Sequence, residues 1–184
     1  EPEFLNQFAV VAYIRGPVAD FVNGLRCELT PGCPHQAHVT VLPPRSISIP
    51  VERAIDESRQ ILSNFHPVPL RIGDVDLVPT THTVKLVVAA GVNELRTLHD
   101  LLGTGPFDGQ DNYPYVPHVT LFKEASGERM DAAASVARER WERFGGCADL
   151  WIDTLTFVRQ RADLTWADLA DLPLGEPVSV NVRR

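Results

Sequence analysis

Residues 34–44 read PHQAHVTVLPP and residues 114–123 read PYVPHVTLFK, so a His-Val-Thr segment followed by an aliphatic residue occurs twice. In each copy the β-branched run predicts a short strand. Successive side chains of a strand point to opposite faces of the sheet, so the histidine and the threonine of each copy share one face. The repeat predicts one site built from two halves. Its residues are His38, Thr40, His118 and Thr120.

The length of 184 residues predicts one domain spanning 1–184. Residues 1–4 lack an initiating methionine, so they are interpreted as a trimmed or added N-terminus. No apolar run approaches the roughly 18 residues that cross a bilayer, and neither a membrane nor a signal peptide is expected. Three cysteines without a CxxC spacing indicate reduced thiols and a cytoplasmic protein.

The net charge of −7, from 17 basic and 24 acidic residues, argues against a protein that holds duplex DNA or long RNA by its backbone. It is compatible with a small anionic substrate bound by a few local positive groups. The expected partner is a small nucleotide or a short RNA 3′ end, bound by a monomer.

Hydrophobic periodicity predicts strands alternating with helices. Pro43-Pro44 is expected to end the first motif strand, and Gly73-Asp74 to form a turn or bulge within another. The expected strands cover 8–15, 36–42, 68–78, 83–88, 116–123, 150–159 and 164–172, and the expected helices cover 17–29, 50–65, 92–102 and 127–144. Because each motif strand is followed by a helix of similar length, the fold class is α+β with two similar lobes facing across a cleft.

In-line displacement at phosphorus needs a base for the attacking oxygen and an acid for the leaving oxygen. Imidazole titrates near 6.5 and serves in either role. The threonine hydroxyls are expected to donate to the non-bridging phosphate oxygens, where charge develops. We expect His118 to activate water and His38 to protonate the leaving 3′ oxygen. Such a site requires no metal and no cofactor.

The paired HVTV and HVTL resemble the two H-x-T-x motifs of the two-histidine (2H) phosphoesterase superfamily, and the chain is most similar to the bacterial 2′-5′ RNA ligase-like, RNA 2′,3′-cyclic phosphodiesterase branch. The resemblance implies a bilobal fold with pseudo-two-fold symmetry, antiparallel sheets lining a central groove and helices outside. It also implies that the histidines are the acid/base pair and that the threonines hold the phosphate. The implied activity is metal-independent hydrolysis of 2′,3′-cyclic phosphates of nucleotides or RNA ends to 2′-phosphates.

Six further residues are candidates for substrate binding. Arg45 and Lys123 follow the motifs and are in reach of a phosphate, although strand-end charges are often simply solvated. Arg159 and Arg161 lie on a late strand that the resemblance places near the groove. Tyr115 and Phe122 flank the second motif and offer rings for base stacking, although an aromatic beside a strand is more often part of the core.

Three other functions remain open on the sequence. One is hydrolysis of 2′-5′-linked or cyclic signalling oligonucleotides, another is 2′-5′ RNA ligation, which the acidic composition disfavours, and the third is a non-catalytic nucleotide-binding module. A metal site is the remaining chemical alternative. It would use Cys33, His35 and His38, or His35, His38 and His118, but no familiar ligand spacing supports it.

Overall fold

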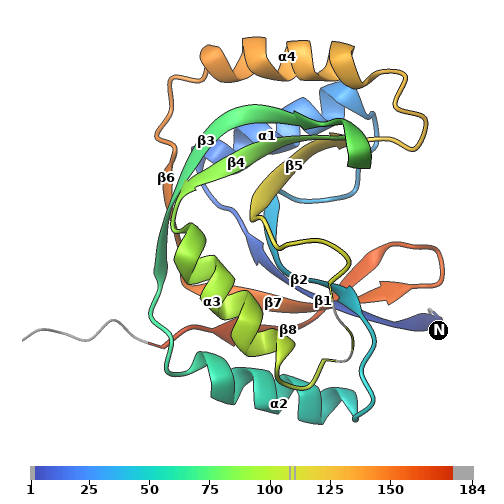
Figure 1. The fold of residues 1–184 in the computed structure, drawn as a ribbon, viewed down its shortest axis with the longest axis vertical. Helices are drawn as coiled ribbons and strands as arrows, with labels where there is room; N and C mark the ends of the chain where they lie inside the picture. The colour runs from blue at the N-terminus through green and yellow to red at the C-terminus, as the bar shows by residue number, and fades with distance from the viewer. Residues whose placement is uncertain (1–2, 108, 110, 176–184) are drawn as a thin grey trace, which may run out of the picture.

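The computed structural model describes residues 3–107, 109 and 111–175, which fold into one antiparallel sheet with helices outside it (Figure 1). The strands are β1 (Phe4–Tyr13), β2 (His38–Arg45), β3 (Val68–Val78), β4 (Thr83–Ala90), β5 (His118–Lys123), β6 (Asp149–Ile152), β7 (Thr154–Arg161) and β8 (Trp166–Pro173). The helices are α1 (Pro17–Leu29), α2 (Val51–Leu62), α3 (Val92–Gly103) and α4 (Met130–Glu142), with a 3₁₀ turn, η1, at Pro79–Thr81.

The sheet has the strand order β6-β3-β4-β5-β2-β1-β7-β8. The two motif strands, β2 and β5, are neighbours at its centre, where Val39 and Val119 are paired. Each half of the sheet therefore has one motif strand at its inner edge and three further strands beyond it. This arrangement confirms the expected α+β fold with two related halves.

The sheet is strongly curled, as the connection between β6 and β7 shows. Ile152 ends β6 and Thr154 begins β7, yet β6 and β7 lie on opposite sides of the two motif strands in the strand order. Two residues span at most about 7 Å. The sheet must therefore bend until its two halves meet behind the centre, which gives the half-barrel shape seen in Figure 1.

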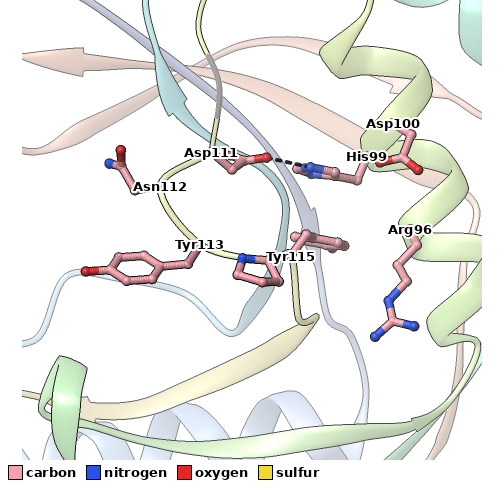
Figure 2. A pocket seen from close by; sticks show the side chains of 8 residues that line it. Arg96, His99, Asp100, Asp111, Asn112, Tyr113 and Tyr115 are labelled. Atoms are coloured by element: carbon pink, nitrogen blue, oxygen red, sulfur yellow. Dashed lines mark ion pairs between the residues drawn. The ribbon is translucent and has the colours of Figure 1, made fainter.

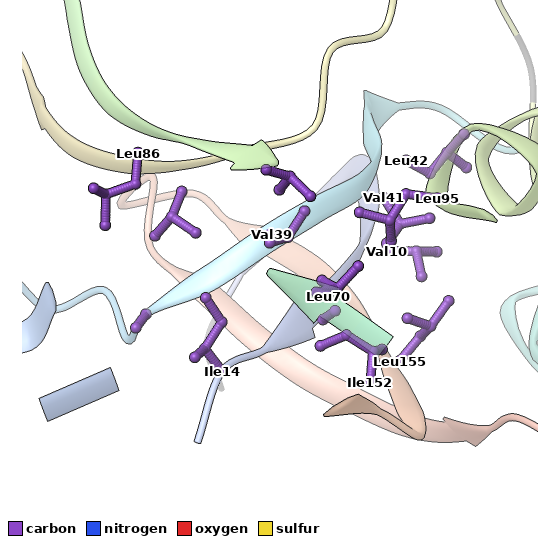
Figure 3. Close-up of a cluster of buried hydrophobic side chains, with 14 of the residues drawn as sticks. Val10, Ile14, Val39, Val41, Leu42, Leu70, Leu86, Leu95, Ile152 and Leu155 are labelled. Atoms are coloured by element: carbon purple, nitrogen blue, oxygen red, sulfur yellow. The ribbon is translucent and has the colours of Figure 1, made fainter. Parts of the chain in front are cut away.

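Each half of the sheet is covered by helices from both parts of the chain. Helix α1 follows β1 but packs on β5 and α4, whereas α3 follows β4 but packs on β2 and α2. The helical side chain of Leu95 joins the sheet residues Val39 and Leu86 in one buried apolar cluster (Figure 3). Val22 of α1 belongs to the same cluster. Burial of this continuous cluster is the main force that holds the two halves together.

The helices begin and end close to the positions expected from the sequence. Helix α1 starts at Pro17, where the missing N–H is no loss, and buries the predicted face with Val18, Val22 and Leu25. The irregularity expected at Gly73-Asp74 is present as a register shift within β3. None of the helices among the described residues has both the length and the apolar character of a bilayer span.

Two expectations were wrong. Pro43 and Pro44 do not end the first motif strand, because β2 continues to Arg45. Both prolines fall between Leu42 and Arg45, where the pairing of β2 with β1 shifts its register. On the other side of β2, the described chain pairs with β5 only at Val39. The missing N–H groups of the prolines therefore remove few hydrogen bonds and cost little.

The other wrong expectation was a single strand over 150–159. It divides at Asp153 into β6, which pairs with β3, and β7, which pairs with β1. The division occurs because the chain crosses there from one half of the curled sheet to the other.

Candidate active site

The four motif side chains lie on the sheet face opposite the helices, which we call the histidine face. Val39 and Val119 are fully buried in the core, so the residues on either side of them point the other way. The antiparallel register through this pair sets each histidine opposite the threonine of the other motif. The structure thus brings the four predicted residues together with approximate two-fold symmetry. They are His38 and Thr40 on β2, and His118 and Thr120 on β5.

Both imidazoles are held by the same kind of backbone hydrogen bond. Nδ1 of His38 lies 2.7 Å from the carbonyl oxygen of Gln36, and Nδ1 of His118 lies 2.8 Å from that of Val116. A carbonyl oxygen only accepts, so each Nδ1 carries the proton. Each neutral ring therefore presents Nε2 as the acceptor, as a general base requires.

Both histidines have depressed pKa values. Burial lowers the pKa of His38 to about 4, although its bond to the Gln36 carbonyl acts in the opposite direction. Burial also lowers the pKa of His118, and the charges of Lys85 and Lys123 add to this effect. A protonated His118 lowers the pKa of His38 as well, which indicates that the two rings are close enough to interact.

A β-bulge follows the threonine in each motif. Beside β1, the pairing steps from Thr40 to Leu42, and beside β4 it steps from Thr120 to Phe122. Each bulge turns the residue two positions after the threonine, Leu42 or Phe122, toward the core, while the threonine stays on the histidine face. Bulges that re-aim side chains are frequent next to functional sites.

Hydrogen bonds from side chains replace backbone pairing where the motif strands β2 and β5 separate. Tyr115 donates its hydroxyl to the carbonyl of Thr40 at 2.9 Å, and Nδ1 of His99 donates to that of Val41 at 2.8 Å. On β5, Nε of the buried Arg26 donates to the carbonyl of Thr120 at 2.7 Å. These bonds fix both motif backbones without a continuous ladder between them.

Lys85 and Lys123 supply positive charge beside the second motif. Lys85 is paired with Thr120 across β4 and β5, so it lies on the histidine face, where it forms a 3.6 Å ion pair with Asp76. The bulge brings Lys123, a predicted substrate-binding residue, onto the same face, opposite Thr83.

Arg45 lies on the core side of the sheet. It is 9% exposed and binds Asp111 at 2.6 Å, while the other oxygen of Asp111 lies 2.7 Å from Nε2 of His99. Its guanidinium is committed to this buried network, so the structure does not bring Arg45 to the motif histidines.

Arg159 and Arg161 also point away from the histidine face. Arg159 is paired with Phe8, a core residue, and its guanidinium stacks on the rings of Phe4 and Phe8 at 5.0 Å. Arg161 binds the carbonyl of Trp166 at 3.1 Å. Alternation along β7 therefore separates both arginines from the motif side chains.

The two predicted aromatic residues differ in their surroundings. Phe122 is 3% exposed, within the main apolar cluster, so its ring is not available to stack on a base. Tyr115 stacks one face on His99, with the ring centroids 4.1 Å apart. Tyr115 also lines a pocket of about 540 Å³ between α3 and the loop before β5 (Figure 2). The lining residues are Arg96, His99, Asp100, Asp111, Asn112, Tyr113, Pro114 and Tyr115.

No group of three or more His, Cys, Asp or Glu side chains in the described part of the chain is arranged to hold a metal ion. The geometry therefore lends no support to the alternative metal sites that include His35, His38 and His118.

Several residues of the site were not predicted from the sequence. Arg26 lies on the buried face of α1 and binds backbone carbonyls on both sides of the site, and Lys85 interrupts an apolar strand. Tyr13 is paired with His38, with the ring centroids 6.3 Å apart, and donates to Asp168 at 2.6 Å. The sequence carried two local signals: Arg26 falls on a helical stripe that is otherwise apolar, and Lys85 falls within an apolar strand.

Comparisons with known proteins identify relatives in sequence. Two bacterial proteins, both named "Putative phosphoesterase", match about two thirds of the chain. That of Geobacillus kaustophilus is 24% identical over 66% of this chain and 71% of its own, and that of Halalkalibacterium halodurans is 25% identical over 67% and 73%.

Among solved structures, Escherichia coli LigT complexed with 3′-AMP superposes with a TM-score of 0.61 at 16% identity, covering 95% of this chain and 99% of LigT. Kluyveromyces marxianus Usb1 with uridine monophosphate gives 0.56 at 13% identity, covering 92% and 98%. At these identities the two structures establish the fold.

A family model supplies the assignment itself. The model of the 2′-5′ RNA ligase superfamily matches residues 17–164, which include both motifs and most of the sheet. The chain therefore belongs to the 2′-5′ RNA ligase superfamily of two-histidine phosphoesterases.

Proposed function

We propose that this phosphoesterase hydrolyses 2′,3′-cyclic phosphates of nucleotides or RNA ends to 2′-phosphates, without a metal ion. One observation carries the proposal: two histidines on paired central strands present Nε2 on the same face, each opposite the threonine of the other motif. This is the geometry that a base and an acid need on opposite sides of one phosphorus atom.

In the proposed reaction, Nε2 of His118 takes a proton from water as the water oxygen bonds to phosphorus. The bond from phosphorus to the 3′ oxygen breaks, and protonated His38 gives its Nε2 proton to that oxygen. The product is a 2′-phosphate with a free 3′-hydroxyl. Solvent then removes the proton from His118 and returns one to His38.

The charges beside the second motif suit the base role of His118, whereas His38, whose pKa is about 4 in the free protein, becomes the acid once the bound phosphate anion raises its pKa. Lys85 and Lys123 lower the pKa of His118 and so keep it neutral, as the base must be. The hydroxyls of Thr40 and Thr120 are expected to donate to the non-bridging oxygens, whose negative charge grows in the transition state.

The relatives agree with a phosphoesterase. The curated relatives carry that word in their names, and solved structures with this fold include complexes with 3′-AMP and with uridine monophosphate. A nucleotide or a short RNA end is therefore our proposed substrate, in keeping with the acidic net charge of −7.

The test is hydrolysis of 2′,3′-cyclic AMP in EDTA by the wild type, His38→Ala and His118→Ala, with His66→Ala, an exposed histidine outside the motifs, as the matched control. We expect both motif variants to lose at least about 10²-fold in kcat and the control to keep its activity. Phosphorus NMR should identify a 2′-phosphate as the product. Loss of activity in only one motif variant would contradict the paired mechanism.

A further inference from the structure

The histidine face carries a second apolar cluster, separate from the main core. Ala9, Val11 and Val158 are buried there, and Tyr13 and Trp166 pack against them. Val11 is paired with Thr40, and Tyr13 with His38, so this cluster begins directly beside the first motif. It forms an apolar floor with two aromatic side chains, the kind of surface on which bases and sugars pack.

Asp168 adds acceptor groups to this floor. It stands opposite Val158 on β8, and its Oδ1 accepts the hydroxyl proton of Tyr13 at 2.6 Å. Burial and the neighbouring Asp168 raise the pKa of Tyr13, so the phenol stays protonated and donates its proton to the hydrogen bond. A small hollow of about 120 Å³ lies alongside, lined by Tyr13, Arg15, Trp151, Ile152, Asp153, Thr154, Thr156, Asp168 and Asp171.

The two halves of the histidine face therefore differ in charge. Lys85 and Lys123 lie beside His118 and suit a phosphate. Tyr13 lies next to His38, and Asp168 is hydrogen-bonded to Tyr13. The carboxylate of Asp168 suits hydrogen-bond donors such as ribose hydroxyls or base amino groups. A carboxylate at this position also repels a phosphate.

We propose, on the basis of the function proposed above, that the nucleoside of the substrate lies over Tyr13 and Trp166 beside Asp168, with the scissile phosphate between the histidines and next to Lys85. The 5′ carbon then extends into the half that contains Asp168. The preferred substrates are nucleoside 2′,3′-cyclic phosphates with a free 5′-hydroxyl, and a 5′-phosphate or a longer RNA chain is disfavoured.

This orientation also fixes the roles of the histidines. The leaving 3′ oxygen belongs to the ribose, and the histidine closest to the nucleoside half is His38, which faces Tyr13. His38 therefore protonates that oxygen. The water attacks from the side of His118.

The test compares kcat/KM for adenosine 2′,3′-cyclic phosphate with kcat/KM for the same compound bearing a 5′-phosphate. We expect the wild type to prefer the 5′-hydroxyl compound by roughly tenfold, because a phosphate close to a carboxylate is repelled. Asp168→Asn should reduce this preference to about twofold. Asp56→Asn, which changes net charge equally at an exposed position on α2, should leave it unchanged.

A second pair of variants checks the assignment of the halves. Lys85→Gln should lower kcat/KM for both compounds by the same factor, because Lys85 contacts the cyclic phosphate that both compounds contain. Tyr13→Ala should raise KM for both by about tenfold with a smaller change in kcat, because it removes ground-state binding of the nucleoside. An unchanged preference in Asp168→Asn, or a selective loss of the 5′-phosphorylated compound in Lys85→Gln, would overturn the proposal.

Binding measurements separate this proposal from the catalytic one. The affinities of adenosine 2′-phosphate and adenosine 2′,5′-bisphosphate, measured by calorimetry, should show the same preference and the same response to Asp168→Asn. Hydrolysis of neither cyclic compound by the wild type, with this binding preference intact, would refute the catalytic function and leave the orientation standing. Equal affinity of the wild type for the two ligands would refute the orientation, whatever the activity.

Discussion

The guanidinium of Arg26, on the first helix, donates to the backbone carbonyl of Thr120, in the second motif, over 2.7 Å. Its Nη1 donates to the carbonyl of Gln36 at 2.8 Å, the same oxygen that holds Nδ1 of His38. One buried side chain therefore fixes the backbone at Thr120 and the oxygen that orients the first histidine.

Arg26→Met should lower the free energy of unfolding by about 3 kcal/mol, because buried carbonyls lose their donors. It should also reduce kcat, since both the Thr120 backbone and the ring of His38 lose support. Urea denaturation and steady-state kinetics measure the two effects. Arg53→Met, at an exposed position of α2, is the control and should change stability by less than about 0.5 kcal/mol. Equal stability of the two variants would show that Arg26 has no such role.

The pH dependence of kcat/KM should show an optimum on the acid side of 6.5. The reaction needs one protonated and one neutral imidazole, and burial lowers the pKa of both histidines in the free protein, that of His38 to about 4. At pH 7 both rings are neutral, so kcat/KM should fall about tenfold per unit as pH rises above the optimum. The kcat profile should peak at higher pH, because a bound phosphate anion favours the imidazolium. A kcat/KM optimum above pH 7.5 would contradict this account.

The stability of the protein should decrease in acid partly through His38. Its pKa is about 4 in the folded protein and about 6.5 in the unfolded chain, so between these values the unfolded chain binds the extra proton. Stability therefore rises with pH across this window, and lowering the pH from 6.5 to 4 should cost on the order of 2 kcal/mol.

The variant that tests this window is His38→Gln, compared with His66→Gln by urea denaturation at several pH values. His38→Gln should show a smaller loss of stability between pH 6.5 and 4.5 than the wild type. His66→Gln should follow the wild type. Parallel curves for all three proteins would mean that His38 is not desolvated in solution.

Thr40→Val and Thr120→Val should each lower kcat by about 10²-fold, because each removes one donor to the developing charge on the phosphate. KM should change less, since the interaction grows toward the transition state. Valine keeps the branched shape and suits a strand, so both variants should fold. Thr97→Val, on the exposed side of α3, serves as the control, and kcat values close to the wild type in the motif variants would exclude a role for these hydroxyls.

The sequence alone determined the local elements and the four motif residues. Periods of two and of 3.6 residues mark strands and helices directly, so β2, β5 and α1 lie close to where they were expected. The alternation of His, Val and Thr set which side chains share a face, because that alternation follows from strand geometry.

Tertiary structure decided what stands beside those residues. Pairing between distant strands put Tyr13 next to His38 and Lys85 next to Thr120, and a bulge brought Lys123 onto the same face. The same pairing turned Arg159 and Arg45 toward the core. There Arg159 stacks on the ring of Phe8, and Arg45 forms an ion pair with Asp111. The continuation of β2 through Pro43 and the division of the strand at Asp153 have the same origin. Strand register, bulges and sheet curl arise from contacts between segments far apart in the chain, and local sequence preferences do not encode them.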